Sequence, residues 1–337
     1  MEALVRVLAM LHLYPPTGNA GAEWAMHTLL AALVKTGHEV DVLIIEPSAI
    51  DQPYTLDDVR VHPRRDKGDP FEWLLDDALR PHVIITHLMN TPRATILGEM
   101  YGIPVVHVLH NDHENERSWL QRRPSLVVYN SDWVRDSCLT WWHDRHVEEP
   151  PAGVVVRPPV IASHYETTPG DRVTLINLCA KKGGQLFWEL ARRMPDVEFL
   201  AVKGAYGQQL VEDLPNVDVQ ECVPGGQMRD LVYARTRVLL VPSEYESWGR
   251  VAVEAMVSGI PVVAQPTPGL RESLGDAGVF ADRDDVDAWV AVIRRLRKIP
   301  VWRAASKRAK ARAAELDPTP DLQTWVYAVE AAARLTV

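Results

Sequence analysis

The 337-residue chain has only three cysteines, too few and too widely spaced for a disulfide framework or a zinc site: Cys138, Cys179 and Cys222. It also has no run of about 18 apolar residues, the length that a membrane-spanning helix needs. The N-terminal segment lacks the basic region and the small-residue cleavage site of a signal peptide. These absences argue against a secreted, disulfide-stapled protein and lead us to expect a cytoplasmic one.

Positive charge is scarce in the first half of the chain. Residues 1–165 carry 14 Lys/Arg against 22 Asp/Glu, whereas the remainder carries 22 against 23. An acidic half is a poor electrostatic match for nucleic acid or an anionic membrane, so nucleic acid is disfavoured as a partner. Residues 294–312 are strongly basic, which fits a solvated helical face or a contact with phosphate or a membrane.

Apolar runs of strand length alternate with helical patterns in two successive series, which predicts an α/β fold with two parallel sheets. The first series of strands is expected at 5–12, 39–45, 82–88, 104–110, 125–131 and 153–157. The second is expected at 172–179, 198–203, 217–221, 238–242, 261–265 and 278–281. The clearest helices are expected at 22–36, 184–194, 226–235, 250–258, 285–298 and 319–335.

A proline-rich stretch, EEPPAGVVVRPPVIASHYETTPG, separates the two series and stiffens the chain between them. We therefore predict an N-terminal Rossmann-like domain over residues 1–165 and a second over 166–317. Residues 318–337 should form a final helix that returns to the N-terminal domain.

Two glutamates lie close to one predicted helix start. Glu246 is in the loop between the strand at 238–242 and the helix at 250–258, and Glu254 is in the second turn of that helix. Between them, the backbone amides of Ser247, Trp248 and Gly249 surround a helix N-terminus, which is a ready anion site. Carboxylates beside such amides suit a ligand that carries both hydroxyls and phosphate. A nucleotide sugar fits that description.

The stretch EYESWGRVAVEAMVSGIPVVAQPTPGLRESLGDAGVF resembles the nucleotide-sugar signature of the family 4 retaining glycosyltransferases, which have the GT-B fold. Further similarity runs along almost the whole chain. PPTGNAGAEWAMHTLLAALVKTGHEVDVL is similar to the family's Gly-rich first loop, helix and strand, and IPVVHVLHN and SLVVYNSDWVRD to two later strands. The resemblance implies two Rossmann-like domains and a nucleoside-diphosphate-sugar donor, UDP- or GDP-linked, with no other cofactor.

The resemblance also implies roles for residues of the second domain. Glu246 would hold hydroxyls of the transferred sugar, and Glu254 would bind the ribose. Lys182, or alternatively Lys181, would neutralise the departing diphosphate. Asn177 stands where the family usually has an arginine, so a cationic phosphate ligand is missing or is replaced. The candidates for that replacement are Lys203 and Arg250.

In the first domain, the resemblance assigns His110 to the active site, near the reacting sugar carbon. Gly21 would let the first loop approach the phosphates, although Ala20 stands where the family has a second glycine. His107, on the opposite face of its strand, is expected to be structural. Asn130 and Arg157 follow later strands, where a role in the site and a role in packing are both open.

One short pattern is a decoy. Asp282-Arg283-Asp284 spells Asp-x-Asp, which in the other glycosyltransferase fold holds a divalent metal. Here it lies between a strand and a helix, where aspartate is an ordinary N-cap. We therefore expect no metal site and metal-independent chemistry.

Together, these features predict a retaining glycosyltransferase that moves a sugar to an acceptor hydroxyl held by residues 1–165. Two other enzymes of this fold remain as alternatives, a sugar-nucleotide epimerase and a hydrolase. From other classes come a nucleic-acid-binding protein, a transferase acting on modified DNA bases, and an inactive sugar-nucleotide sensor. The nucleic-acid alternative depends on arginines interleaved with Trp119, Trp133, Trp141 and Trp142, which could stack bases.

Overall fold

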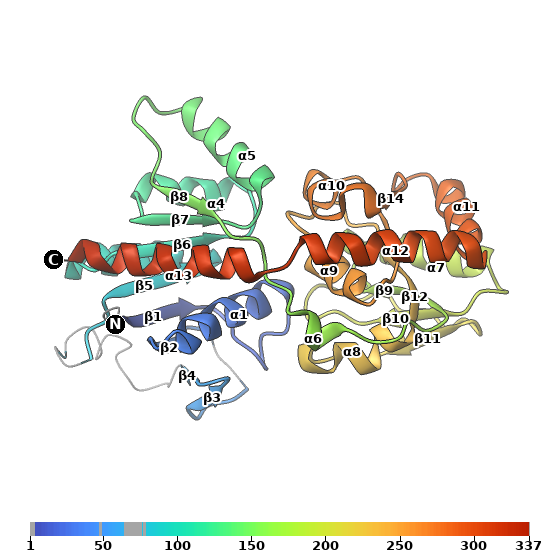
Figure 1. The fold of residues 1–337 in the computed structure, drawn as a ribbon, viewed down its shortest axis with the longest axis horizontal. Helices are drawn as coiled ribbons and strands as arrows, with labels where there is room; N and C mark the ends of the chain where they lie inside the picture. The colour runs from blue at the N-terminus through green and yellow to red at the C-terminus, as the bar shows by residue number, and fades with distance from the viewer. Residues whose placement is uncertain (1–3, 47–48, 64–75, 77–78, 337) are drawn as a thin grey trace. The chain divides into compact units, whose positions relative to one another are not determined.

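The computed structural model describes residues 4–46, 49–63, 76 and 79–336. The chain divides into two compact units (Figure 1). Unit 1 comprises Met1–Gly18, Ala22–Pro159 and Thr319–Val337, and unit 2 comprises Asn19–Gly21 and Val160–Pro318. Within the described ranges, no helix combines the length and apolar character needed to cross a membrane.

Unit 1 is built on an eight-stranded sheet with the order β3-β4-β2-β1-β5-β6-β7-β8. All neighbouring strands are parallel except β3 and β4. The strands are β1 (Arg6–Leu11), β2 (Glu39–Ile44), β3 (Tyr54–Leu56), β4 (Val59–His62), β5 (Val83–His87), β6 (Val105–Leu109), β7 (Leu126–Tyr129) and β8 (Gly153–Val155). The sequence did not predict β3 and β4, because these strands are short and alternate apolar with polar residues rather than forming an apolar run.

Unit 2 is built on a wholly parallel six-stranded sheet with the order β11-β10-β9-β12-β13-β14. Its strands are β9 (Arg172–Ile176), β10 (Phe199–Val202), β11 (Val217–Gln220), β12 (Thr236–Val241), β13 (Val262–Ala264) and β14 (Val279–Phe280). The main helices are α7 (Gly184–Arg193), α9 (Arg250–Val257), α10 (Pro268–Leu274), α11 (Val286–Leu296) and α12 (Ile299–Glu315). The two parallel α/β units confirm the predicted fold class.

The chain enters unit 2 at Val160, a little before the boundary expected at residue 165. The physical reason is that Val160 and Tyr165 are buried in the apolar core of unit 2. The short helix α6 (Ala162–Tyr165) therefore packs with unit 2, although it follows the proline-rich stretch.

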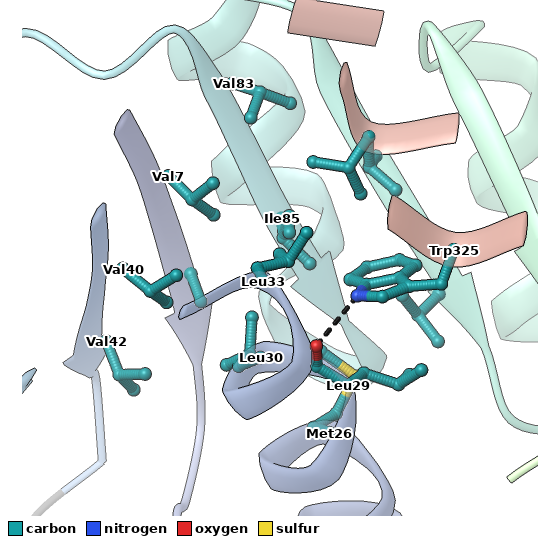
Figure 2. Close-up of a cluster of buried hydrophobic side chains, with 14 of the residues drawn as sticks. Val7, Met26, Leu29, Leu30, Leu33, Val40, Val42, Val83, Ile85 and Trp325 are labelled. Carbon is teal, nitrogen blue, oxygen red and sulfur yellow. Dashed lines mark hydrogen bonds between the residues drawn. The ribbon is translucent and has the colours of Figure 1, made fainter. Parts of the chain in front are cut away.

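The final helix, α13 (Thr319–Ala333), is part of unit 1. Trp325 is fully buried there among residues of β1, β2, β5 and helix α1 (Gly21–Lys35) (Figure 2). Its indole Nε1 donates a hydrogen bond to the carbonyl oxygen of Leu29 at 2.8 Å. Arg157, which follows β8, donates to the carboxylate of Asp321 at 2.8 Å. Helix α13 is thus held by apolar burial and by polar contacts at both its start and its middle.

The basic segment predicted near 294–312 falls on α11 and α12. In α12, Ala305 and Ala309 are buried, whereas Arg303, Lys307 and Lys310 are exposed on the other side of the helix. The alanines therefore form the packed stripe of the helix and the cations form its solvent face.

Candidate functional site

The loop between β12 and α9 carries Glu246, and the turn before α7 carries Lys182. The two side chains form an ion pair through Nζ of Lys182 and Oε1 of Glu246. Ser243 donates a hydrogen bond to the same oxygen at 2.9 Å. Because both contacts fall on Oε1, the carboxylate has a fixed orientation in which Oε2 can accept from another group. The structure thus brings together two residues that lie 64 positions apart in the sequence.

Lys182 keeps its positive charge in this setting. Burial by itself would lower the pKa of the Lys182 ammonium, but Glu246 and the neighbouring Tyr206 outweigh it and raise that pKa above its ordinary value. The influence of Tyr206 on Lys182 was not predicted from the sequence. Its only signal was an aromatic residue in a glycine-flanked loop after a strand. Lys182 is therefore positively charged, which is the state in which a lysine binds phosphate groups.

Two glycines allow the Glu246 loop to adopt its shape. Gly249 has a positive φ of 81°, and a Cβ there would lie 2.5 Å from Cδ2 of Leu270. Gly269, near the start of α10, packs its backbone directly against the loop, because a Cβ there would lie 2.4 Å from the carbonyl oxygen of Glu246. The Gly-rich part of the signature thus fixes the position of the first glutamate.

Arg283 contacts the same loops and follows β14, the edge strand of the unit 2 sheet. Its guanidinium donates hydrogen bonds to the carbonyl oxygens of Ala180, Lys181 and Pro242. These oxygens belong to the two segments that carry Lys182 and Glu246. Arg283 was set aside in the sequence as the middle of an Asp-x-Asp decoy, but here it ties the lysine turn to the end of β12.

The acidic members of the decoy have structural contacts. Asp282 accepts a hydrogen bond from the backbone amide of Asp284 at 3.0 Å. The N-cap of α11 is the next residue, Asp285, whose side chain accepts from the amide of Ala288 at 2.9 Å. We expected Asp282 or Asp284 to cap this helix, and that expectation is wrong because the N-cap residue is Asp285. In the described part of the chain, no group of three or more metal-ligating side chains was found.

Asn177 stabilises a turn at the place where the family has an arginine. It has a positive φ of 70° and is buried. Its Oδ1 accepts from the amide of Cys179 at 3.1 Å and from Gln209 Nε2 at 3.0 Å. Lys203, one candidate for the missing cation, forms a surface ion pair with Glu221 at 2.6 Å.

Arg250, the other candidate, forms a buried cluster with Glu254. Its Nη1 donates to Oε1 of Glu254 at 2.5 Å, and its Nη2 donates to the hydroxyl of Tyr165 at 2.9 Å. Tyr233 donates to Oε2 of Glu254 at 2.5 Å. Burial raises the pKa of Glu254, while Arg250 and the tyrosines act in the opposite direction. Both carboxylate oxygens thus have protein partners, and the Glu254 side chain is only 4% exposed.

Trp248 and Ser247 complete the loop before α9. Trp248 is 3% exposed and belongs to the apolar core of unit 2. Its ring is therefore part of the core, and only its backbone amide is left for the anion site that the sequence predicts. Gly249 is the N-cap residue of α9, and no side chain caps this helix end. The first amides of α9 are consequently not satisfied by a capping side chain.

In unit 1, His110 directly follows β6 and contacts a second histidine. Nε2 of His110 lies 2.9 Å from Nδ1 of His87, the last residue of β5. Asn130 donates a hydrogen bond to the backbone carbonyl of His110 at 2.9 Å. Burial lowers the pKa of His110 to about 4, although Glu23 and Glu116 act in the opposite direction. His110 is therefore neutral near pH 7, which suits orienting a ligand better than donating a proton.

The sequence missed three residues around His110, namely His12, Glu23 and His87. Glu23 lies in the first turn of α1 and pairs with His12, which follows β1, at 3.2 Å between Oε1 and Nε2. The rings of His12 and His87 are 5.1 Å apart. Three histidines that each end a strand of one parallel sheet could have been expected to meet, because those ends share one edge.

The remaining predicted residues are placed as follows. His107 is fully buried, with Nε2 3.6 Å from Glu116, in keeping with a structural role. Gly21 is the first residue of α1 and has no positive φ. Trp141 and Trp142, two of the proposed base-stacking residues, are only 4% and 2% exposed. Rings buried to that degree offer no open face for stacking bases.

Two family models match the chain. Residues 20–176 match the family described as "Glycosyl transferase 4-like domain", and residues 207–315 match "Glycosyl transferases group 1". Together these matches span more than half of the sequence. The chain belongs to the family 4-like glycosyltransferases of the GT-B fold.

Among curated proteins, the chain is similar to glycogen synthase of Mycobacterium tuberculosis, with 26% identity covering 95% of this chain and 92% of that one. It is also 43% identical to O-antigen chain mannosyltransferase B of Escherichia coli, over 21% of this chain and 19% of that protein. It is 37% identical to D-inositol 3-phosphate glycosyltransferase of Streptosporangium roseum, over 26% of this chain and 21% of that protein. The chain thus aligns with only about a fifth of the last two proteins.

Solved structures share the fold over nearly the whole chain. HepE of Anabaena, crystallised with UDP-glucose, superposes with a TM-score of 0.78 at 16% identity, covering 97% of this chain and all of that one. Sucrose-phosphate synthase of Thermosynechococcus elongatus superposes with a TM-score of 0.74 at 16% identity, covering 95% of this chain and 97% of that one.

Proposed function

We propose that this glycosyltransferase moves a hexosyl group from a UDP- or GDP-linked sugar to an acceptor hydroxyl in the cytoplasm, with retention of configuration and without a metal ion. The observation that carries the proposal is the Lys182–Glu246 pair beside the uncapped start of α9. Lys182 and the first amides of α9 would meet the diphosphate, and Oε2 of Glu246 would accept from a hydroxyl of the sugar. The likeness to HepE, which was crystallised with UDP-glucose, supports the choice of donor.

The chemistry would depend on position and charge. As the bond from the sugar to phosphate breaks, negative charge grows on the diphosphate, where Lys182 and the helix amides stabilise it. The carboxylate of Glu246 holds the sugar through its hydroxyl, so the ring keeps its orientation as the acceptor approaches. Neutral His110 would orient the sugar near the reacting carbon, while Asn130 fixes the backbone of that histidine.

A binding and turnover series tests this proposal. Thermal unfolding should be followed with UDP-glucose, GDP-mannose, UDP and GDP, because a ligand at 100 times its Kd adds about 2.7 kcal/mol to the free energy of unfolding. Turnover should then persist in excess EDTA, and NMR of the product should show the anomeric configuration of the donor. If no sugar nucleotide stabilises the protein, or if activity needs added manganese or magnesium, the proposal is wrong.

Product analysis with and without acceptor separates the remaining enzymes of this fold. A transferase should form a new glycoside only when an acceptor is present. An epimerase would interconvert sugar nucleotides, and a hydrolase would release free sugar at the same rate in both reactions.

A further inference from the structure

Among the buried side-chain atoms of unit 1 that have no hydrogen-bond partner in the described part of the chain, three lie on neighbouring side chains at one edge of the sheet. They are Oε2 of Glu23, Nδ1 of His12 and Nε2 of His87. Buried polar atoms in folded proteins nearly always have a partner, so three such atoms in one place need an explanation. They are neighbours, because His12 contacts Glu23 at 3.2 Å and lies against the ring of His87.

The cluster lies where a ligand of this fold would bind. His12 follows β1 and His87 ends β5, and these two strands are parallel neighbours at the centre of the sheet. Glu23 is in the first turn of α1, the helix that follows β1. Ligands of parallel α/β sheets bind at the carboxyl ends of the strands.

Glu23 carries a negative charge in this position. Burial alone would raise the pKa of Glu23, but hydrogen bonds from His12 and from its own backbone amide lower that pKa below its ordinary value. An ionised carboxylate only accepts hydrogen bonds, so Oε2 needs a partner that donates. Burial lowers the pKa of His87, so this imidazole is neutral. The unpartnered Nε2 of this neutral imidazole donates or accepts according to its tautomer, so it can meet a hydroxyl, which does both.

We propose that Glu23 is an acceptor-binding residue whose Oε2 accepts a hydrogen bond from an uncharged hydroxyl of a sugar or polyol, with His12 holding the carboxylate in place. This inference rests on the proposed function and adds a substrate class to it. A phosphate group does not fit at this point, because its oxygens would face the acceptor-only Oε2 of Glu23. The hydroxyl that binds here therefore belongs to a neutral part of the acceptor.

A purely structural role explains less of the geometry. A first-turn glutamate that only paired with His12 would use Oε1, and that contact is present. It would not leave Oε2, His12 Nδ1 and His87 Nε2 unpartnered on neighbouring side chains.

The test compares matched pairs of acceptor probes in the full-length protein. With UDP-glucose or GDP-mannose as donor, nucleotide release is measured with methyl α-D-glucoside against glucose 6-phosphate, and with myo-inositol against myo-inositol 1-phosphate. The neutral member of at least one pair should accelerate release. In Glu23→Gln that acceleration should fall roughly 10- to 150-fold, as expected for loss of a hydrogen bond to a charged group. Release without acceptor should fall far less than the acceptor-dependent acceleration.

Two further variants keep the test decisive. Glu99→Gln changes an exposed glutamate on α3 (Thr91–Tyr101) and should behave as the wild type. Glu23→Asp keeps the charge but withdraws the carboxylate, and it replaces Glu23→Gln if that variant does not fold. The inference is overturned if only phosphorylated probes accelerate release, if none does, or if both Glu23 variants match Glu99→Gln. If the wild type binds no sugar nucleotide in the absence of acceptor, the proposed function itself has failed.

Discussion

Arg250 and Glu254 face each other one turn apart on α9, with Nη1 and Oε1 separated by 2.5 Å. Tyr165 and Tyr233 complete the contacts on either side of this pair. The glutamate that resembles the family's ribose ligand is therefore also part of a buried electrostatic cluster. Its replacement must affect the fold of unit 2 as well as donor binding.

Glu254→Ala should reduce the free energy of unfolding by about 3–5 kcal/mol, because it leaves the buried Arg250 guanidinium without its carboxylate. Glu254→Gln keeps an acceptor for Arg250 and should cost less. Urea unfolding measures both. The control is Glu189→Ala, which removes an exposed pair with Arg192 and should cost no more than about 1 kcal/mol. Equal costs for Glu254→Ala and Glu189→Ala would show that the cluster does not stabilise the unit.

Glu246→Gln should separate turnover from nucleotide binding. The substitution keeps the shape of the side chain but removes its charge, so kcat should fall roughly 10- to 150-fold while the Kd for UDP or GDP stays within a few-fold. Calorimetry measures the Kd and product release measures kcat. The neighbouring Glu244 is exposed, and Glu244→Gln is the control. Loss of nucleotide binding with an unchanged kcat would mean that Glu246 contacts the nucleotide and not the transferred sugar.

Arg283→Lys should weaken donor binding, although the proposed function includes no contact between Arg283 and the donor. In the wild type, Nη1 bonds the carbonyl oxygens of Lys181 and Pro242, and Nη2 bonds that of Ala180. Lysine replaces this rigid two-nitrogen fork with one flexible ammonium, so the tie between the Lys182 turn and β12 is weakened. We expect the donor Kd to rise about 10-fold, equivalent to about 1.4 kcal/mol. Asp284→Ala, at the exposed neighbouring position, should leave the Kd unchanged. Wild-type affinity in Arg283→Lys would mean that the turn holds its shape without the brace.

Stability should depend on pH through His110. Burial holds the pKa of His110 at about 4 in the folded protein, below the value of about 6.5 for an unfolded histidine. Between these values the unfolded chain binds a proton that the folded one does not, so the free energy of unfolding should decrease as pH falls from about 6.5 towards about 4. His110→Gln should lose less stability over this range than the wild type. Replacement of the exposed His143 by Gln should not alter the slope, and equal slopes for all three proteins would contradict the assignment.

The sequence predicted the two parallel sheets well, because buried parallel strands are continuous apolar runs that a single chain displays openly. It could not predict β3 and β4, since pairing with β2 rather than composition makes them strands. The family resemblance pointed to Lys182 and Glu246, and the structure brings these two side chains into an ion pair. The sequence carried no sign of Arg283 or Gln209, because these side chains act by bonding backbone atoms of distant turns, and such contacts leave no pattern in sequence.

Unit 1 shows the same difference. His110 was singled out through the family resemblance, because it ends a motif that the family shares. The neighbouring His12, Glu23 and His87 come from three separate segments, and only the order of strands in the sheet brings them together. The buried position of Glu254 was equally hidden, because its partners Tyr165 and Tyr233 come from α6 and from the turn before β12.

The position of Trp325 sets an order for biosynthesis. Unit 1 contains helix α13, so its apolar core in Figure 2 lacks the Trp325 side chain until the ribosome has translated the whole of unit 2 and then α13. Unit 2 ends at Pro318 and contains all its own core residues before then. The half of the protein that is made first is thus the half that finishes folding last, and a nascent chain that stops before α13 leaves the apolar surface around Leu29 and Leu33 uncovered for chaperones to bind.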